Sequence, residues 1–139
     1  MSFENPHPDA LCAMMRDEVK TIAVVGLSPN VNRPSHRIAA ALQRLGYRVI
    51  PVRPLVREVL GEAAYPDLSS VPLAVDLVNV FRAAQHVGTV VDECLRLGLR
   101  RLWLQQGIVN EVQAGRARAA GMTVVMNLCI LTHYRTYCQ

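Results

Sequence analysis

The sequence predicts an α/β fold: a single domain in which a mostly parallel sheet of five strands lies between two layers of helices. Short apolar runs typical of buried strands alternate with segments whose apolar residues recur at helical spacing. This alternation favours parallel strands joined by helical crossovers. A chain of 139 residues, of which 51% are hydrophobic, is long enough to bury the core of one such domain.

The first strand, turn and helix lie in residues 21–45. Residues 22–25 form an unbroken apolar run, typical of a strand covered on both faces. Gly26 follows where the chain must turn sharply, and Pro34 suits the first turn of a helix that ends near Gly46. Free backbone N–H groups and the helix dipole point outward from such a helix start. The unit therefore predicts a site for a phosphate-bearing ligand.

The remaining elements continue the alternation. We expect further strands over residues 47–52, 75–81, 101–105 and 122–126. We expect helices over residues 9–20, with Asp9 as the cap, within 82–98 and over 110–120, and a turn or brief helix over 127–139. Pro51 cannot donate a ladder hydrogen bond, so its strand should end there or lie at an edge of the sheet. Residues 1–8 contain two prolines and are expected to be a flexible tail before the domain of residues 9–139.

Composition and charge narrow the class of partner. The formal net charge of +4 suits an acidic ligand, but the basic residues are spread over the chain and aromatic residues make up only 5%. A nucleic-acid partner is therefore not expected, because that would need a gathered basic face with stacking platforms. No apolar run is long enough to span a membrane, and the first residues do not match a signal peptide.

The four cysteines show no metal-ligand spacing. Cys12, Cys94, Cys129 and Cys138 form no Cys-x-x-Cys pair, and no histidine pair stands at zinc-ligand spacing. We therefore expect no metal site, reduced thiols and a cytoplasmic location. Cys129 is most simply a small buried hydrophobe, with a reactive thiol as the alternative.

The carboxyl ends of the strands carry the candidate ligand residues, because ligands bind there in open parallel sheets. An NAD site would place three glycines after the first strand, whereas this chain has Gly26, Ser28 and Val31. The second strand ends at Arg53 rather than at a carboxylate that could bind a ribose diol. An arginine favours an additional phosphate, as in NADP or coenzyme A.

The order of several motifs resembles that of a known family. IAVVGLS at residues 22–28, NRPSHRIAAAL at 32–42, GYRVIPVRP at 46–54, VDLVNVFR at 75–82 and WLQQGIVN at 103–110 are similar to stretches of the CoA-binding domain family. These proteins are small stand-alone relatives of the N-terminal domain of the succinyl-CoA synthetase alpha subunit. The resemblance implies a Rossmann-like fold and a bound coenzyme A or acyl-CoA.

The resemblance also implies which residues bind the coenzyme. Gly26, Leu27 and Ser28 would receive the diphosphate, and Arg33 and Ser35 would add a charge and a hydroxyl beside it. Val52, Arg53 and Pro54 would flank the adenosine. Phe81 and Arg82 would border the cleft, and Gln106 and Gly107 would lie nearer the pantetheine arm. Many relatives have Asn where this chain has Arg53. They often have Asp-Arg before the cysteine that matches Cys129, where this chain has Asn127 and Leu128.

The sequence thus predicts a small cytoplasmic protein that binds coenzyme A or an acyl-CoA and has no identifiable catalytic set. The ligase relatives use a phosphorylated histidine in a later domain, and the histidines here, including His36, have no carboxylate at motif spacing. Two alternatives remain open at this point. One is an NADP-dependent or acyl-CoA-handling enzyme, and the other is a ligand-free regulatory interaction module.

Overall fold

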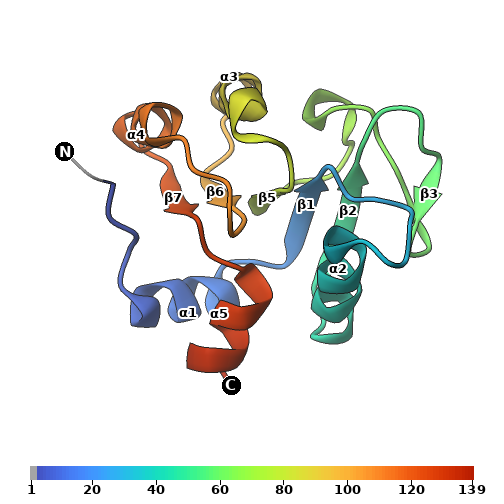
Figure 1. Ribbon diagram of the computed structural model, residues 1–139, viewed down its shortest axis with the longest axis horizontal. Coiled ribbons are helices and arrows are strands. Elements are labelled where there is room, and N and C mark those ends of the chain that lie inside the picture. The colour runs from blue at the N-terminus through green and yellow to red at the C-terminus, as the bar shows by residue number, and fades with distance from the viewer. Residues whose placement is uncertain (1–2) are drawn as a thin grey trace.

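The computed structural model describes residues 3–139 and confirms the predicted α/β domain (Figure 1). Five strands form one parallel sheet in the order β2-β1-β5-β6-β7. Their bounds are β1 Thr21–Val25, β2 Arg48–Val52, β5 Leu77–Val80, β6 Arg101–Leu104 and β7 Thr123–Met126. The chain passes from β1 to β2 on one side and then returns to β5 on the other. The direction of winding therefore reverses between β1 and β5.

Helices cover both faces of the sheet (Figure 1). One face carries α1 Pro8–Asp17, α2 Pro34–Arg44 and α5 Ile130–Tyr137, and the other carries α3 Val87–Leu97 and α4 Glu111–Ala119. Successive side chains of β1 enter opposite layers: Ile22 and Val24 pack with the first group, Ala23 and Val25 with the second. Within residues 3–139, no helix is long and apolar enough to cross a membrane.

Pro51 lies in an edge strand, as expected. The N–H and C=O of one strand residue point to the same side, and Pro51 turns this side away from β1. Its carbonyl accepts from Tyr65 N at 3.0 Å, and Arg53 N donates to Tyr65 O at 2.8 Å, so the missing donor interrupts no bond with β1. On the inner side, Val52 O accepts from Gly26 N at 2.8 Å. The end of β2 is thereby held against the end of β1.

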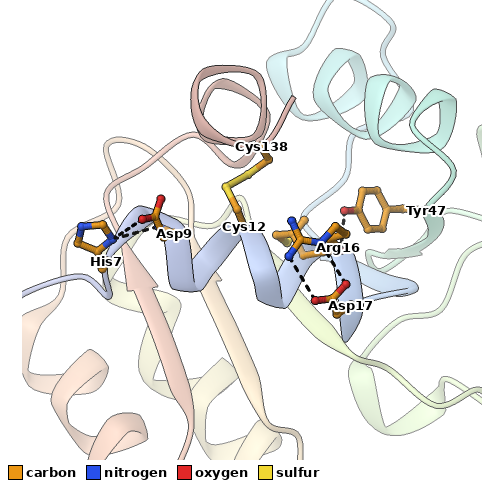
Figure 2. The surroundings of a disulfide bond; sticks show 8 residues. His7, Asp9, Cys12, Arg16, Asp17, Tyr47 and Cys138 are labelled. Carbon is orange, nitrogen blue, oxygen red and sulfur yellow. Dashed lines mark hydrogen bonds and ion pairs between the residues drawn. A yellow bond between two sulfur atoms is a disulfide. The ribbon is translucent and has the colours of Figure 1, made fainter.

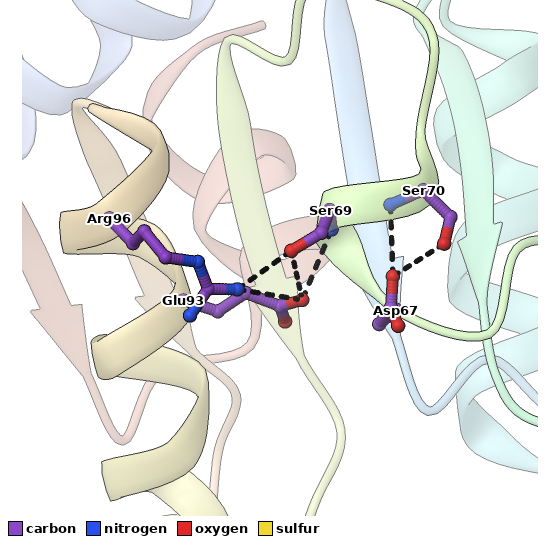
Figure 3. Close-up of polar contacts among 5 residues, drawn as sticks. All are labelled: Asp67, Ser69, Ser70, Glu93 and Arg96. Carbon is purple, nitrogen blue, oxygen red and sulfur yellow. Dashed lines mark hydrogen bonds and ion pairs between the residues drawn. The ribbon is translucent and has the colours of Figure 1, made fainter.

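The long connection after β2 contains structure that the sequence patterns did not predict. It forms a small hairpin, β3 Glu58–Val59 with β4 Glu62–Ala63, and then the 3-10 turn η1 Leu68–Ser70. Figure 3 shows how η1 is fixed to α3. The backbone N–H and hydroxyl of Ser69 both donate to Glu93 Oε2, at 3.1 and 3.0 Å, and Arg96 donates to the Ser69 hydroxyl. Asp67 caps the turn by accepting from Ser70 N at 2.9 Å. A second 3-10 turn, η2 Ala84–His86, precedes α3.

Residues 3–7 differ from the flexible tail expected for residues 1–8, whose first two residues lie outside the described part. Asn5 makes two hydrogen bonds with the backbone of Met126, Nδ2 to O at 2.9 Å and Oδ1 from N at 2.8 Å. The Arg118 guanidinium lies 3.7 Å from the centre of the Phe3 ring. Asn5 thereby pairs the backbone groups of Met126 at the open edge of β7. Helix α1 begins at Pro8, and its cap is His7, which accepts from Asp9 N at 3.1 Å, rather than Asp9.

A disulfide joins Cys12 in α1 to Cys138 just after α5 (Figure 2). The expectation of four reduced thiols is therefore wrong for this pair, while Cys94 and Cys129 are free. The two cysteines are 126 residues apart, and only the packing of α1 beside α5 brings their Cα atoms to 5.2 Å. No local spacing could reveal such a pair. The neighbouring Tyr47 hydroxyl donates to Met15 O at 2.8 Å and ties α1 to the start of β2 (Figure 2).

Replacing Cys138 with serine should lower the free energy of unfolding by about 2–4 kcal/mol under oxidising conditions, because a long closed loop restricts the unfolded chain. Chemical denaturation followed by circular dichroism measures the difference. In the presence of a thiol reductant the variant and the parent should unfold at the same denaturant concentration. Equal stability of the two proteins without reductant would contradict the pairing.

Candidate functional site

Three adjoining hollows open at the carboxyl edge of the sheet, where the winding reverses between β1 and β5. The first, of about 520 Å³, lies over the turn after β1 and the start of α2. The second, of about 510 Å³, extends from Arg53 to His86. The third, of about 470 Å³, extends from Ile38 to Cys129. Phe81 lines all three, so they adjoin one another, and together we call them the cleft. It lies at the position where open α/β sheets bind ligands.

Gly26 begins the turn at the centre of this cleft. Its φ of +88° lies in the left-handed region, and a Cβ at this position would stand 2.6 Å from the Phe81 carbonyl oxygen. Any side chain would therefore force the ends of β1 and β5 apart. The position requires glycine for both reasons, and the turn is drawn tightly against the neighbouring strand ends.

Two buried hydroxyl groups fix the loop that follows. Ser28 N donates to Ser35 Oγ at 3.0 Å, and Asn30 N donates to Ser28 Oγ at 3.1 Å. His36 Nδ1 meets Ser28 O at 2.9 Å, so this histidine holds the loop rather than only occupying the surface. Each hydroxyl accepts one backbone N–H and retains its own O–H for donation. The Ser28 N–H, in contrast, is committed to the loop.

The start of α2 opens onto the same hollow. Arg33 occupies the cap position of α2, and Pro34 occupies the first position of the helix. Within residues 3–139, no hydrogen bond joins the Arg33 side chain to the start of the helix. Both residues line the hollow with Ser35. Pro34 has no N–H, and the N–H groups of His36 and Arg37 both donate to Arg33 O, at 3.1 and 3.2 Å. The Ser35 N–H and the positive dipole end of the helix are therefore what α2 offers to the cleft. This is a binding geometry for an anion.

Arginines surround the glycine turn. Arg53 is half-buried and its Nη1 donates to Gly26 O at 3.3 Å, while the Cδ of Arg82 lies 3.3 Å from the Cβ position built on Gly26. Arg33 is exposed at the outer rim. Within the described chain, none of these three arginines has a carboxylate within 4.0 Å, and the hollows of the cleft have no Asp or Glu in their walls. The cleft therefore carries uncompensated positive charge around the helix start.

The third hollow has mainly apolar walls and a polar inner end. Its apolar walls come from Pro34, Ile38, Phe81, Ala83 and Ile108. Gln105, which is only 5% exposed, lies at the inner end, and its Oε1 accepts from Asn79 Nδ2 and from Ile130 N, each at 3.3 Å. Gln105 thus joins the centre of the sheet to the start of α5. From the sequence we expect Gln105 within a strand and take Gln106 and Gly107 as the binding residues. The polar side chain of Gln105 at the end of a buried strand is the feature that could have indicated its place in the cleft.

Cys129 lies beside Gln105 at the first turn of α5 and lines the third hollow. Burial raises the pKa of its thiol, but the Thr132 hydroxyl, the backbone amides of Thr132 and Leu131 and the Gln105 side chain favour the thiolate, and the pKa is lowered overall. Burial raises the pKa of Cys94 to about 12, with a contribution from Glu93. The two free thiols therefore differ in both access and ionisation.

The structure brings most of the predicted binding residues to this cleft. Those that line one of its hollows are Gly26, Ser28, Arg33, Ser35, Arg53, Pro54, Phe81, Arg82 and Gln106. The Leu27 side chain is fully buried in the core, so only its backbone can face a ligand. Val52 lines a smaller hollow of about 180 Å³ beyond Pro54. Gly107 lines none of them and donates to Asn127 Oδ1 at 2.8 Å.

Iodoacetamide at neutral pH is expected to alkylate Cys129 in the folded protein and to spare Cys94, because the thiolate is the nucleophile and only Cys129 combines access with a lowered pKa. Mass spectrometry of digested samples follows both sites over time. Thr132→Val removes the hydroxyl near the sulfur and should slow the reaction at Cys129. Equal alkylation of the two cysteines in folded protein would contradict this assignment.

The chain is similar to known proteins over most of its length. Residues 20–135 match the family model described as a CoA binding domain. The uncharacterized protein YneT of Bacillus subtilis is 42% identical over 111 residues, which cover 80% of this chain and 82% of YneT. A solved structure from Thermus thermophilus, described as cell-free ID.343, superimposes with a TM-score of 0.90 at 31% identity and covers 95% of this chain and 99% of that one.

A larger enzyme shares the same region. Acetate–CoA ligase [ADP-forming] I of Archaeoglobus fulgidus is 35% identical over 77 residues, which cover 55% of this chain and 11% of the ligase. The similarity therefore extends over only a small part of that enzyme. Since the family model covers most of the chain and YneT matches over most of both lengths, this chain belongs to the CoA binding domain family.

Proposed function

We propose that this protein binds coenzyme A or an acyl-CoA in the cleft at the carboxyl edge of the sheet. The observation that carries the proposal is the set of Arg33, Arg53 and Arg82 around the Gly26 turn and the uncapped start of α2, without a carboxylate in the cleft. A diphosphate would accept from guanidinium groups that have no carboxylate partner and from the Ser35 N–H at the start of α2. Family membership supports coenzyme A as its source.

The shape of the cleft orders the parts of the ligand. In this proposal the diphosphate lies over Gly26, and the adenosine extends along Val52, Arg53 and Pro54. The pantetheine arm then runs the other way through the apolar third hollow, towards Gln105 and Gln106. A long flexible arm with amide groups suits a channel of apolar walls that ends in side-chain amides. The inner end of this hollow is where an acyl group would lie.

Binding, rather than ligation, is the activity proposed here. The support is a difference in coverage. The matched region makes up only 11% of the ligase, whereas YneT and the Thermus thermophilus protein match this chain over most of their own lengths. The proposal includes a cytoplasmic location. In that location the Cys12–Cys138 pair would be reduced, because the cytoplasm keeps thiols reduced.

Thermal unfolding with coenzyme A, dephospho-coenzyme A, NAD and NADP is the direct test of ligand class. A ligand that binds only the folded state raises the melting temperature, and the rise grows with the logarithm of ligand concentration divided by Kd. We expect coenzyme A and dephospho-coenzyme A to stabilise the protein, and NAD and NADP to have little effect. Stabilisation by NADP without any by coenzyme A would contradict the proposal and favour the dinucleotide alternative.

Arg53→Ala should weaken coenzyme A by about tenfold or more, because hydrogen bonds to charged groups contribute roughly 1.5–3 kcal/mol. Since Arg53 reaches back over Gly26, dephospho-coenzyme A should be weakened by a similar factor. Arg44→Ala, at the far end of α2 and exposed, is the control and should bind like the parent. Titration calorimetry measures both. If Arg53→Ala weakened the affinity for coenzyme A but not for dephospho-coenzyme A, Arg53 would bind the ribose phosphate rather than the diphosphate, and this placement would be contradicted.

Gly26→Ala separates the close approach at the turn from simple backbone strain. Gly98 also has positive φ, +70°, but an added Cβ would meet nothing within 4 Å, so Gly98→Ala is the matched control. Both variants should lose about 1 kcal/mol or more of stability through φ strain. Only Gly26→Ala should also lose coenzyme A binding in calorimetry. If folded Gly26→Ala bound coenzyme A with unchanged affinity, the turn would not be part of the binding site.

A further inference from the structure

A second group of chemically reactive side chains lies away from the cleft, where α1 packs beside α5. Cys12 comes from α1, Cys138 follows α5, and His133 lies within α5. The two sulfur atoms and one ring nitrogen of His133 all lie within 4.8 Å of one another. None of the three residues lines the hollows of the cleft. His133 and Cys138 are only five residues apart, but Cys12 is 126 residues from Cys138, so the sequence does not show the three as one set.

His133 is the unusual member of this group. It is only 6% exposed, and its Nε2 is buried without a hydrogen-bond partner among residues 3–139. The ring is held between Trp103 and Tyr137, with centroids 5.5 and 4.8 Å away. Burial lowers the pKa of His133. An imidazole held between two aromatic rings, with one buried nitrogen that has no partner, is placed to act as a ligand.

We propose that, once the disulfide is reduced, Cys12, Cys138 and His133 form a binding site for Zn²⁺ or a similar soft divalent ion. Thiolate sulfur and imidazole nitrogen are the ligands that Zn²⁺ prefers, and three protein ligands leave one position for water. The half-buried Cys138 gives that position access to solvent.

The disulfide and the metal site exclude each other. A dithiol reductant supplies two electrons and two protons, the Sγ–Sγ bond of Cys12 and Cys138 breaks, and the reductant becomes a disulfide. Zn²⁺ then replaces the two thiol protons, which pass to solvent, and the sulfur atoms coordinate as thiolates. Either state links α1 to α5. The same three residues would therefore hold α1 and α5 together in oxidising and in reducing surroundings.

Cobalt titration of the whole protein tests the site. Protein reduced with a phosphine under argon should bind one Co²⁺ with thiolate-to-metal charge-transfer absorption, and Zn²⁺ should displace it. Unreduced protein should show no such absorption. Absence of this absorption from the reduced protein, or equal absorption without reduction, would overturn the proposal.

Single substitutions identify the ligands, with circular dichroism as the check on folding. Cys12→Ser, Cys138→Ser and His133→Phe should each weaken binding at least about tenfold, since even the loss of a supporting group typically has an effect of that size. Phenylalanine keeps an aromatic ring beside Trp103 but removes the nitrogen atoms. Cys94→Ala, which removes a buried free thiol elsewhere, is the matched control and should bind like the parent. Unchanged binding in folded His133→Phe or Cys12→Ser would overturn the assignment.

A measurement on the unaltered protein covers variants that fail to fold. In reduced protein, Zn²⁺ should slow the alkylation of Cys12 and Cys138 at least about tenfold and leave Cys129 as reactive as before. Peptide mass spectrometry resolves the sites. Equal alkylation of Cys12 and Cys138 with and without Zn²⁺ would overturn the proposal. Because the readout is independent of coenzyme A, the result also stands apart from the function proposed for the cleft.

Discussion

The close approach of the Gly26 backbone to the end of β5 is the constraint on which the rest of the site depends. A side chain there would collide with the Phe81 carbonyl at 2.6 Å, and the turn donates to Val52 O at 2.8 Å. The ends of three neighbouring strands, β2, β1 and β5, are thereby gathered around one bare stretch of backbone. This arrangement leaves room above the turn and aims the start of α2 into it. An anion site of this kind needs little more than backbone and a missing side chain.

Charge and buried polarity then divide the cleft into two functional ends. Arg53 and Arg82 lie on either side of the turn, so positive charge is concentrated where the helix dipole is also positive. At the other end, Asn79, Gln105 and Ile130 N form a buried chain of hydrogen bonds that fixes the first turn of α5 and places Cys129 at the inner wall. The family to which the chain belongs gives this polarity a meaning, because coenzyme A joins a charged nucleotide to a long thiol-bearing arm.

Much of the architecture could be predicted from local patterns. The apolar runs located the strands, Gly26 and Pro34 located the turn and helix, and Pro51 correctly indicated an edge strand. The β3–β4 hairpin escaped prediction because its strands contain only two residues each, too few to show a period. Gln105 was misjudged because its importance comes from partners 25 and 26 residues away. The disulfide and the position of His133 depend wholly on the docking of α1 beside α5, which no spacing within the sequence encodes.

The most direct test of the central claim is to observe the turn itself while coenzyme A is added. In ¹⁵N-labelled protein, the amide resonances of Leu27 and Ser35 should move early and strongly during the titration, because their N–H groups would face the diphosphate, whereas the Gly26 N–H is bonded to Val52 O. The amide resonances of α1, a helix that lines none of the three hollows, should not move. If coenzyme A binds and the resonances of the turn do not move, the ligand lies elsewhere and this account of the cleft is wrong.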